Sequence, residues 1–187
     1  MFAERGKGAP STSLGRNGWG LLVLALLASS PALAEERYDH RGSLGLTVAF
    51  GGEAVAAVTS TADGERGIRL PIEVGGTLSL SDHNELRVAG RLSPGVGELT
   101  ALGGSFYAGL RNSIGYDQWK TFFDLELAAH VTPFLAFGVR GAFGVQFDFL
   151  PVMGVYAQLG GQLGGATSLR LSFELMAGVQ FRTYVFE

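Results

Sequence analysis

The chain has 187 residues, of which 47% are hydrophobic and 17% charged, and its formal net charge at pH 7 is −3. The length suits one domain, and the negative charge argues against a nucleic-acid-binding surface. The sequence contains no cysteine, which excludes both disulfides and lipoprotein acylation.

The first 34 residues have the layout of a secretory signal peptide. Basic residues precede an apolar run from Trp19 to Ala28, and Ala32-Leu33-Ala34 supplies the small-residue cleavage site. The alternative is a membrane-anchoring helix, but such a helix needs about 20 apolar residues and this run has about half as many. We therefore predict Sec export, cleavage near Ala34, and a mature domain over residues 35–187.

The mature region reads as strands from its beginning. Between about Arg41 and Gly51, and again from Ile68 to Leu80, apolar residues alternate with small or polar ones. Successive side chains of a strand point to opposite faces, so each segment has one apolar and one polar face. The connection between the two segments, Gly52 to Gly67, is the longest in the chain and has a polar tip near Asp63.

The next three predicted strands follow a turn cluster at residues 81–84. They run from Leu86 to Leu92, from Leu99 to Arg111, and from Trp119 to Leu127. In the second of them, Tyr107 shares its face with glycine and serine, which is acceptable in a lumen if its hydroxyl is bonded.

The last three predicted strands cover 137–148, 153–163 and 169–182. No segment of the chain has the helical period of 3.6 residues, and no later run reaches the ~18 apolar residues of a membrane helix. Eight such segments predict an all-β fold, an eight-stranded antiparallel up-and-down transmembrane β-barrel. An even strand number puts both termini on one side, so a periplasmic start places the 52–67 connection outside the cell.

Alternation alone also fits a soluble barrel whose apolar face points inward. The polar face decides between the two, because it consists mostly of glycine, alanine, serine and threonine, as the narrow interior of a small barrel requires. Aromatics such as Phe50, Trp119, Phe147 and Phe181 lie near segment ends of the apolar face, which is typical of interfacial girdles. We place Leu171 near the membrane midplane, where arginine would be costly.

Twelve charged residues of the polar face are expected to meet inside the barrel. Enclosed ions must be paired or strongly hydrated, and eight strands leave an interior just wide enough for side chains. We therefore interpret these residues as a plug, with an ion path through a narrow passive channel as the alternative. The predicted lumen ion network consists of Arg69, Glu73, Arg87, Arg91, Lys120, Asp124, Glu126, Arg140, Asp148, Arg170, Glu174 and Arg182.

The mature chain resembles the eight-stranded outer-membrane barrels, the group of the OmpA-type membrane domain and the OmpX-like proteins. The resemblance rests on the inward Arg and Glu pattern, on the segment from Thr132 to Gly138, and on the last strand, Ser168 to Phe186. It implies assembly by the barrel insertion machinery, a periplasmic C-terminus, and a role in envelope integrity, adhesion or defence.

Catalytic and metal sites have few candidates. Glu126 and His130 share a face and could lie near each other, but a hydrolase would also need a serine or threonine within hydrogen-bond reach. His40, His83 and His130 fall at separate strand ends without ligand spacing, so no metal or cofactor is expected.

The sequence thus predicts a non-enzymatic outer-membrane barrel with a charged, plugged lumen and a role in envelope structure or surface interaction. A porin-like channel, and less so a membrane-embedded lipid-modifying enzyme, are the alternatives. The expected partners are outer-membrane lipids, the insertion machinery and an extracellular ligand at loop 52–67. We expect a monomer.

Overall fold

The computed structural model describes residues 41–57, 66–97, 101–115, 118–132, 135–165 and 169–184. All of them belong to a unit that spans Glu36–Glu187. The predicted signal peptide and the tip of the predicted 52–67 loop lie outside the described residues. Within the described ranges, no helix has the length and apolar character needed to cross a membrane.

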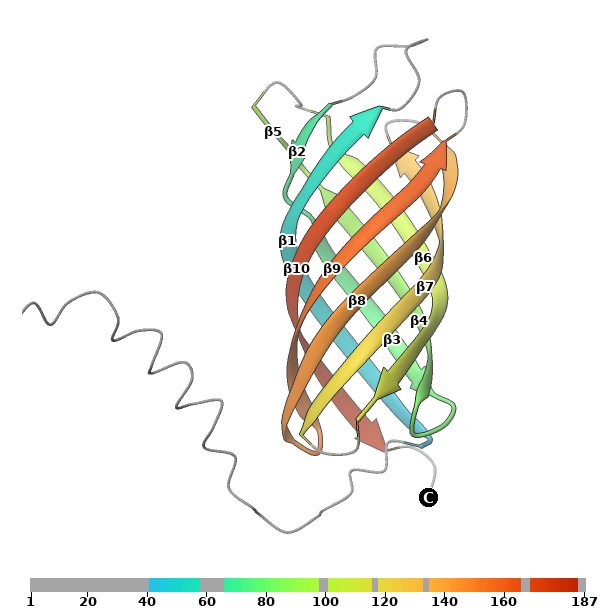
Figure 1. Ribbon diagram of the computed structural model, residues 1–187, viewed down its shortest axis with the longest axis vertical. Helices are drawn as coiled ribbons and strands as arrows, with labels where there is room; N and C mark the ends of the chain where they lie inside the picture. Colours follow the sequence, from blue (N-terminus) through green and yellow to red (C-terminus); the bar gives the residue numbers. More distant parts are fainter. Residues whose placement is uncertain are drawn as a thin grey trace, which may run out of the picture. The chain divides into compact units, whose positions relative to one another are not determined.

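Within these ranges, ten strands form one antiparallel sheet, which closes on itself where β10 pairs with β1 (Figure 1). They are β1 (Ser43–Ala57), β2 (Gly67–Arg69), β3 (Ile72–Ser79), β4 (Asn84–Ser93), β5 (Gly95–Val96), β6 (Gly103–Ile114), β7 (Trp119–Thr132), β8 (Ala136–Leu150), β9 (Met153–Gly165) and β10 (Leu169–Tyr184).

These ten labelled strands make the eight strands of the barrel wall. β2 and β3 are two parts of one wall strand that is interrupted at Pro71, and β4 and β5 are two parts of another that is interrupted at Pro94. Both interruptions occur because proline has no N–H to donate to the ladder. The ladder is bridged there by Gly51 N–H to Pro71 O at 3.1 Å and by Leu70 N–H to Pro94 O at 2.9 Å. The predicted eight-stranded up-and-down barrel is confirmed.

The strands are staggered, and the stagger sets the width of the lumen. Following paired residues once around the wall from Thr47 leads to Ala57, ten residues further along β1. Eight strands with this stagger tilt by about 40° and enclose a space that side chains can fill. The path runs through Thr47, Gly75, Ala89, Tyr107, Ala128, Gly138, Gly164, Arg170 and Ala57.

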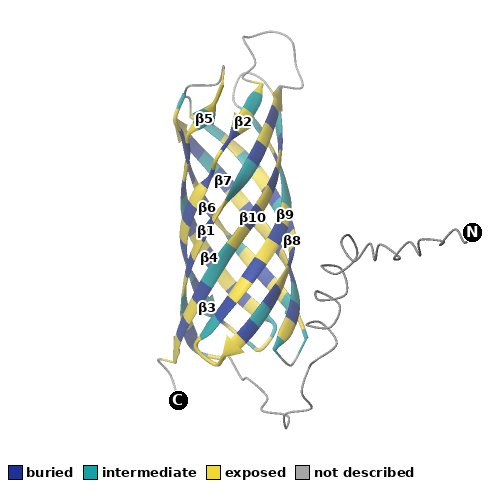
Figure 2. Cartoon of the chain, turned by 90° about the vertical axis from the view of Figure 1, so that its left-hand side faces the viewer, coloured by how far each residue is buried: buried dark blue, intermediate teal, exposed yellow. Residues whose placement is uncertain are grey.

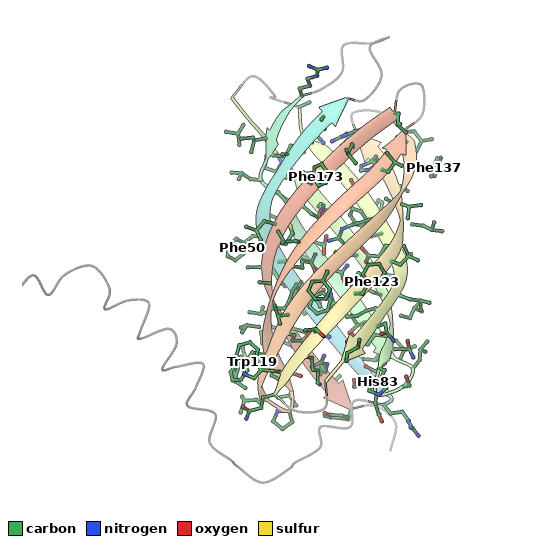
Figure 3. The ribbon with its side chains drawn as sticks, in the orientation of Figure 1. Phe50, His83, Trp119, Phe123, Phe137 and Phe173 are labelled. Carbon is green, nitrogen blue, oxygen red and sulfur yellow. The ribbon has the colours of Figure 1, made fainter. Side chains whose placement is uncertain are left out.

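The two faces of the wall carry opposite chemistry, as the sequence alternation predicts. Figure 2 shows buried and exposed residues alternating along every long strand. Leu127 and Phe50 are 70% and 68% exposed on the outside, whereas Asp124 and Arg140 are fully buried inside. Phe137 points outward near one end of the barrel and Trp119 near the other (Figure 3).

Two sequence predictions need correction. β1 continues past Gly52 to Ala57, so residues 52–57 are strand rather than loop, and Glu53 is buried in the lumen. The alternation predicts that the first strand ends at about Gly51, but Gly51 and Gly52 both lie within the ladder that pairs β1 with β10. Leu171 lies close to the start of β10, near a rim of the barrel rather than at mid-height.

Candidate functional site

The lumen contains a buried ion network. We call it the central network; it comprises four arginines and four carboxylates from β3, β4, β6, β7, β8 and β10, each at most 5% exposed. Each residue lies on the inward face of its strand, so the strand register alone brings them together. The members of the central network are Glu73, Arg87, Arg91, Arg111, Asp124, Glu126, Arg140 and Glu174.

Six of the eight form a closed ring of alternating charge. Every arginine of the ring contacts two glutamates, and every glutamate contacts two arginines, so each charge is compensated from both sides. Such geometry is what buried ions need to offset the cost of desolvation. The order around the ring is Glu73, Arg87, Glu126, Arg140, Glu174, Arg91 and back to Glu73.

The ring is tightened by hydrogen bonds and by an aromatic neighbour. Arg91 Nε donates to Glu73 at 2.9 Å and its Nη1 donates to Glu174 at 2.5 Å. Arg140 Nε donates to Glu174 at 2.8 Å. The guanidinium carbons of Arg91 and Arg140 lie 4.6 and 5.1 Å from the ring centre of Tyr107, within the range of cation–π attraction.

A separate pair joins the ring from the side. Arg111 donates through Nε and Nη2 to the two oxygens of Asp124, at 2.7 and 2.8 Å. Asp124 also lies 3.9 Å from Arg87 Nη1, which links the pair to the ring. This fork-on-fork arrangement fixes the orientation of both side chains.

A second ionic group lies nearer one end of the barrel. We call this end, where β1 begins at Ser43 and β10 ends at Tyr184, the terminal rim; the other end is the opposite rim. Asp148 accepts from Lys120 Nζ at 2.9 Å and from Arg182 Nη1 at 3.2 Å. Arg182 Nη2 lies 3.4 Å from Glu85. The rim group is therefore Glu85, Lys120, Asp148 and Arg182.

Toward the opposite rim, a chain of neutral polar groups leads into the ring. Ser105 Oγ lies 2.7 Å from His130 Nδ1, and the Gln162 amide nitrogen contacts His130 Nε2. The Tyr107 hydroxyl donates to Gln162 Oε1 at 3.2 Å. Glu126, which the sequence suggested as a partner of His130, is bound instead to the ring arginines.

The structure places the twelve sequence-predicted residues in different surroundings. Six form the ring, Asp124 joins it through Arg87 and also binds Arg111, and three form the rim group with Glu85. Arg69, on β2, and Arg170, on β10, lie toward the opposite rim, outside both groups.

Sequence reasoning missed Arg111, Glu53 and Glu85. Arg111 shares the parity of Tyr107 and so carried the inward signal, but it stood at the end of the predicted segment. Glu85 follows a turn cluster and Glu53 follows two glycines, so neither was read as part of a strand.

The two histidines of the described residues lie in different surroundings. His83 lies in the turn before β4, with its Nδ1 3.1 Å from the Ser113 carbonyl oxygen, and His130 lies in the lumen, while His40 is outside the described residues. Across the described ranges, no group of three or more His, Asp or Glu side chains is placed to hold a metal ion.

No protein-family model matches the sequence, and no curated protein sequence matches it significantly. Solved structures do match it. The N-terminal β-barrel domain of OprF from Pseudomonas aeruginosa has a TM-score of 0.59 at 14% identity, covering 76% of this chain and 98% of that one. Neisserial surface protein A (NspA) has a TM-score of 0.56 at 14% identity, covering 75% and 96%. Ail of Yersinia pestis has a TM-score of 0.52 at 11% identity, covering 76% and 99%.

This chain has the fold of the small outer-membrane β-barrels. The resemblance inferred from the sequence is therefore confirmed at the level of fold. The outer face agrees with it, because leucine, valine and phenylalanine side chains stay about half exposed or more on nearly every long strand. Water would not tolerate so large an apolar surface on a monomer, whereas lipid covers it. The barrel thus faces lipid with its apolar side chains and encloses its charges.

Proposed function

We propose that this protein is a closed outer-membrane barrel that acts in envelope structure or at the cell surface, rather than as a pore or an enzyme. The observation that carries this proposal is the charged ring. Its side chains are at most 2% exposed, and each one is held by two opposite charges. Eight strands leave an interior just wide enough for side chains, so a lumen that holds this ring has little room for a continuous water path.

The closed lumen can be tested with protein purified from outer membranes and added to planar lipid bilayers. We expect no ion conductance above that of the lipid alone, at either polarity of the voltage. Steady conductance of the wild type would replace the proposal with the narrow passive channel.

We also propose that the terminal rim is periplasmic and the opposite rim extracellular, as short periplasmic turns and an even strand number favour. The connection between β1 and β2, centred on Asp63, would then be the contact surface for an extracellular ligand. An epitope tag inserted at Asp63 should bind antibody on intact cells. A tag that is reached only after the outer membrane is permeabilised would reverse the orientation.

Residues 1–34 are proposed to be removed on Sec export, leaving a domain over residues 35–187 that the barrel insertion machinery assembles as a monomer. The mass of the protein extracted from outer membranes tests the first step and should correspond to a chain that begins at Glu35. A mass that retains Met1 would contradict cleavage. Depletion of the insertion machinery should reduce the amount of folded protein.

A non-enzymatic role is favoured by the surroundings of His130. Both of its ring nitrogens are engaged, by Ser105 and by the Gln162 amide, and a donor amide at Nε2 leaves the Nδ1 proton to point at Ser105. The Ser105 hydroxyl oxygen then accepts a hydrogen bond from Nδ1–H, so the imidazole cannot take the serine proton as the base of a nucleophilic serine must. Lipopolysaccharide and phospholipids from expressing cells should have unchanged masses, and a new deacylated or transferred product would overturn this part of the proposal.

A further inference from the structure

An apolar layer separates the two ionic groups of the lumen. Three successive residues on the inward face of β7 show this. Lys120 belongs to the rim group and Asp124 to the central network, and Phe122 lies between them and belongs to neither. Phe122 meets Tyr156 of β9 edge-on, with ring centres 6.0 Å apart. The two rings form a buried cluster with Ala49 and Met176. We call Ala49, Phe122, Tyr156 and Met176 the aromatic layer.

Two inward glycines make room for the rings. A Cβ atom on Gly144 of β8 would overlap the Phe122 ring, and one on Gly178 of β10 would lie 2.7 Å from Tyr156 Cζ. Real Cβ atoms do not approach so closely, so any larger residue at either position would push a ring away. The wall is therefore shaped to hold both rings across the lumen.

Arg111 contacts both the aromatic layer and the central network. Its guanidinium carbon lies 3.8 Å from the centre of the Phe122 ring and 5.4 Å from that of Tyr156. The same guanidinium is fixed by its forked bond to Asp124. A cation held over an aromatic face attracts that face, so the position of Phe122 is set from the network side.

The ring of charges and the aromatic layer oppose a passing ion differently. Each ring member has two partners, and Arg140 also lies 4.0 Å from a third carboxylate, Glu73, so pairs can exchange while every charge stays compensated. The side chains of the aromatic layer offer an ion no charge of either sign. An apolar constriction of this kind excludes ions because they cannot replace their hydration there.

Polar side chains lie next to the aromatic layer on the side that faces the central network. Gln158 lies two residues beyond Tyr156 on β9, is 2% exposed, and neither atom of its amide has a hydrogen-bond partner among the described residues. A buried amide of this kind is ordinarily bonded to internal water. The Tyr156 hydroxyl also has no hydrogen-bond partner among the described residues, so the wetted part of the lumen would reach this oxygen and end at the two ring faces.

We propose that the aromatic layer, and not the ring of charges, is the barrier that stops ions in this barrel. Phe122 and Tyr156 are the blocking side chains, Arg111 positions Phe122, and Gly144 and Gly178 provide their space. This inference rests on the proposed closed lumen and assigns the closure to named residues.

The test compares the two neighbouring phenylalanines of β7 in planar bilayers. Phe122 is 2% exposed in the lumen, and Phe123 is 50% exposed toward lipid, so Phe123→Ala is a matched control. We expect Phe122→Ala to raise ion conductance at least about tenfold over the background of the lipid alone, which is all that the wild type should show, because an apolar constriction has been widened. Phe123→Ala should stay as silent as the wild type, and Tyr156→Phe, which keeps the ring, should also stay silent.

The outcomes separate this inference from the proposed function. A conducting wild type would refute the closed lumen itself. In a second outcome, neither the wild type nor a folded Phe122→Ala variant conducts ions, but Arg140→Ala does. The lumen would then be closed, and the barrier would be the ring of charges rather than the aromatic layer. If Phe122→Ala fails to fold, judged by its migration on unheated gels, Phe122→Val and Tyr156→Ala decide by the same criterion.

Discussion

Glu174 and Leu175 are consecutive residues of β10 with opposite surroundings. Glu174 is 5% exposed in the lumen and binds Arg91 and Arg140, whereas Leu175 is 59% exposed on the outer face. A shift of one residue in register would exchange the two environments along the whole strand. The pair therefore reports directly on which face meets lipid.

Arginine on the outer face should be costly according to depth. Leu175 lies near the middle of β10 and Leu171 near its beginning at the opposite rim. Leu175→Arg should lower the free energy of unfolding by about 2–4 kcal/mol, and Leu171→Arg by about 1 kcal/mol or less. Equilibrium unfolding in urea from lipid vesicles measures both, and equal costs at the two positions would contradict the assigned depth.

The ring predicts that Arg140 cannot be replaced by lysine. Arg140 contacts Glu126 and Glu174 at once, which a planar fork can do and a single ammonium does poorly. Arg140→Ala should lower the free energy of unfolding by about 3–5 kcal/mol, because two buried carboxylates lose a partner. Arg140→Lys should recover only part of this loss. Full recovery would indicate that the charge matters but the bridging geometry does not.

Arg111 and Asp124 should behave as one unit. They bind each other through two hydrogen bonds, so removing either leaves the other charge poorly compensated. Arg111→Ala and Asp124→Ala should each cost about 3 kcal/mol, and the double variant should cost at least about 1 kcal/mol less than their sum. Additive losses in a double-mutant cycle would mean that the pair contributes no coupling.

Two neighbouring glycines of β1 should respond in opposite ways to the same substitution. A Cβ on Gly51 would overlap the backbone carbonyl of Leu175, whereas one on Gly52 meets nothing within 4 Å. Gly51→Ala should therefore destabilise the barrel by about 1–3 kcal/mol. Gly52→Ala should be neutral or stabilise it by up to about 1 kcal/mol, since the unfolded chain loses freedom. Similar melting temperatures for the two variants would contradict the close approach of β1 and β10.

The fold and the faces could be predicted because both depend on period-two alternation, which each strand carries locally. The inward direction of Glu73, Arg87 and Arg140 followed from parity alone. The ring could not be predicted, because it depends on which residues of five different strands reach one level of a staggered barrel. That level is set by the pairing register, which no single segment encodes.

Predictions from local sequence were also wrong where pairing with a distant strand, or a distant side chain, decided the outcome. The alternation of the first segment predicts an end at about Gly51, but pairing with β10 extends the strand to Ala57. Glu126 and His130 share a face of β7, yet the ring arginines bind Glu126, and Ser105 and Gln162 bind His130. Parity places residues on a face, whereas competition among partners decides which of them meet.

The most direct test is the migration of the protein from the membrane fraction on a denaturing gel, with and without heating. A barrel whose apolar face contacts lipid and whose ionised residues are enclosed should stay folded in cold detergent and run faster than the heated sample. Recovery of the processed protein in the soluble periplasmic fraction, with one mobility whether heated or not, would contradict the account.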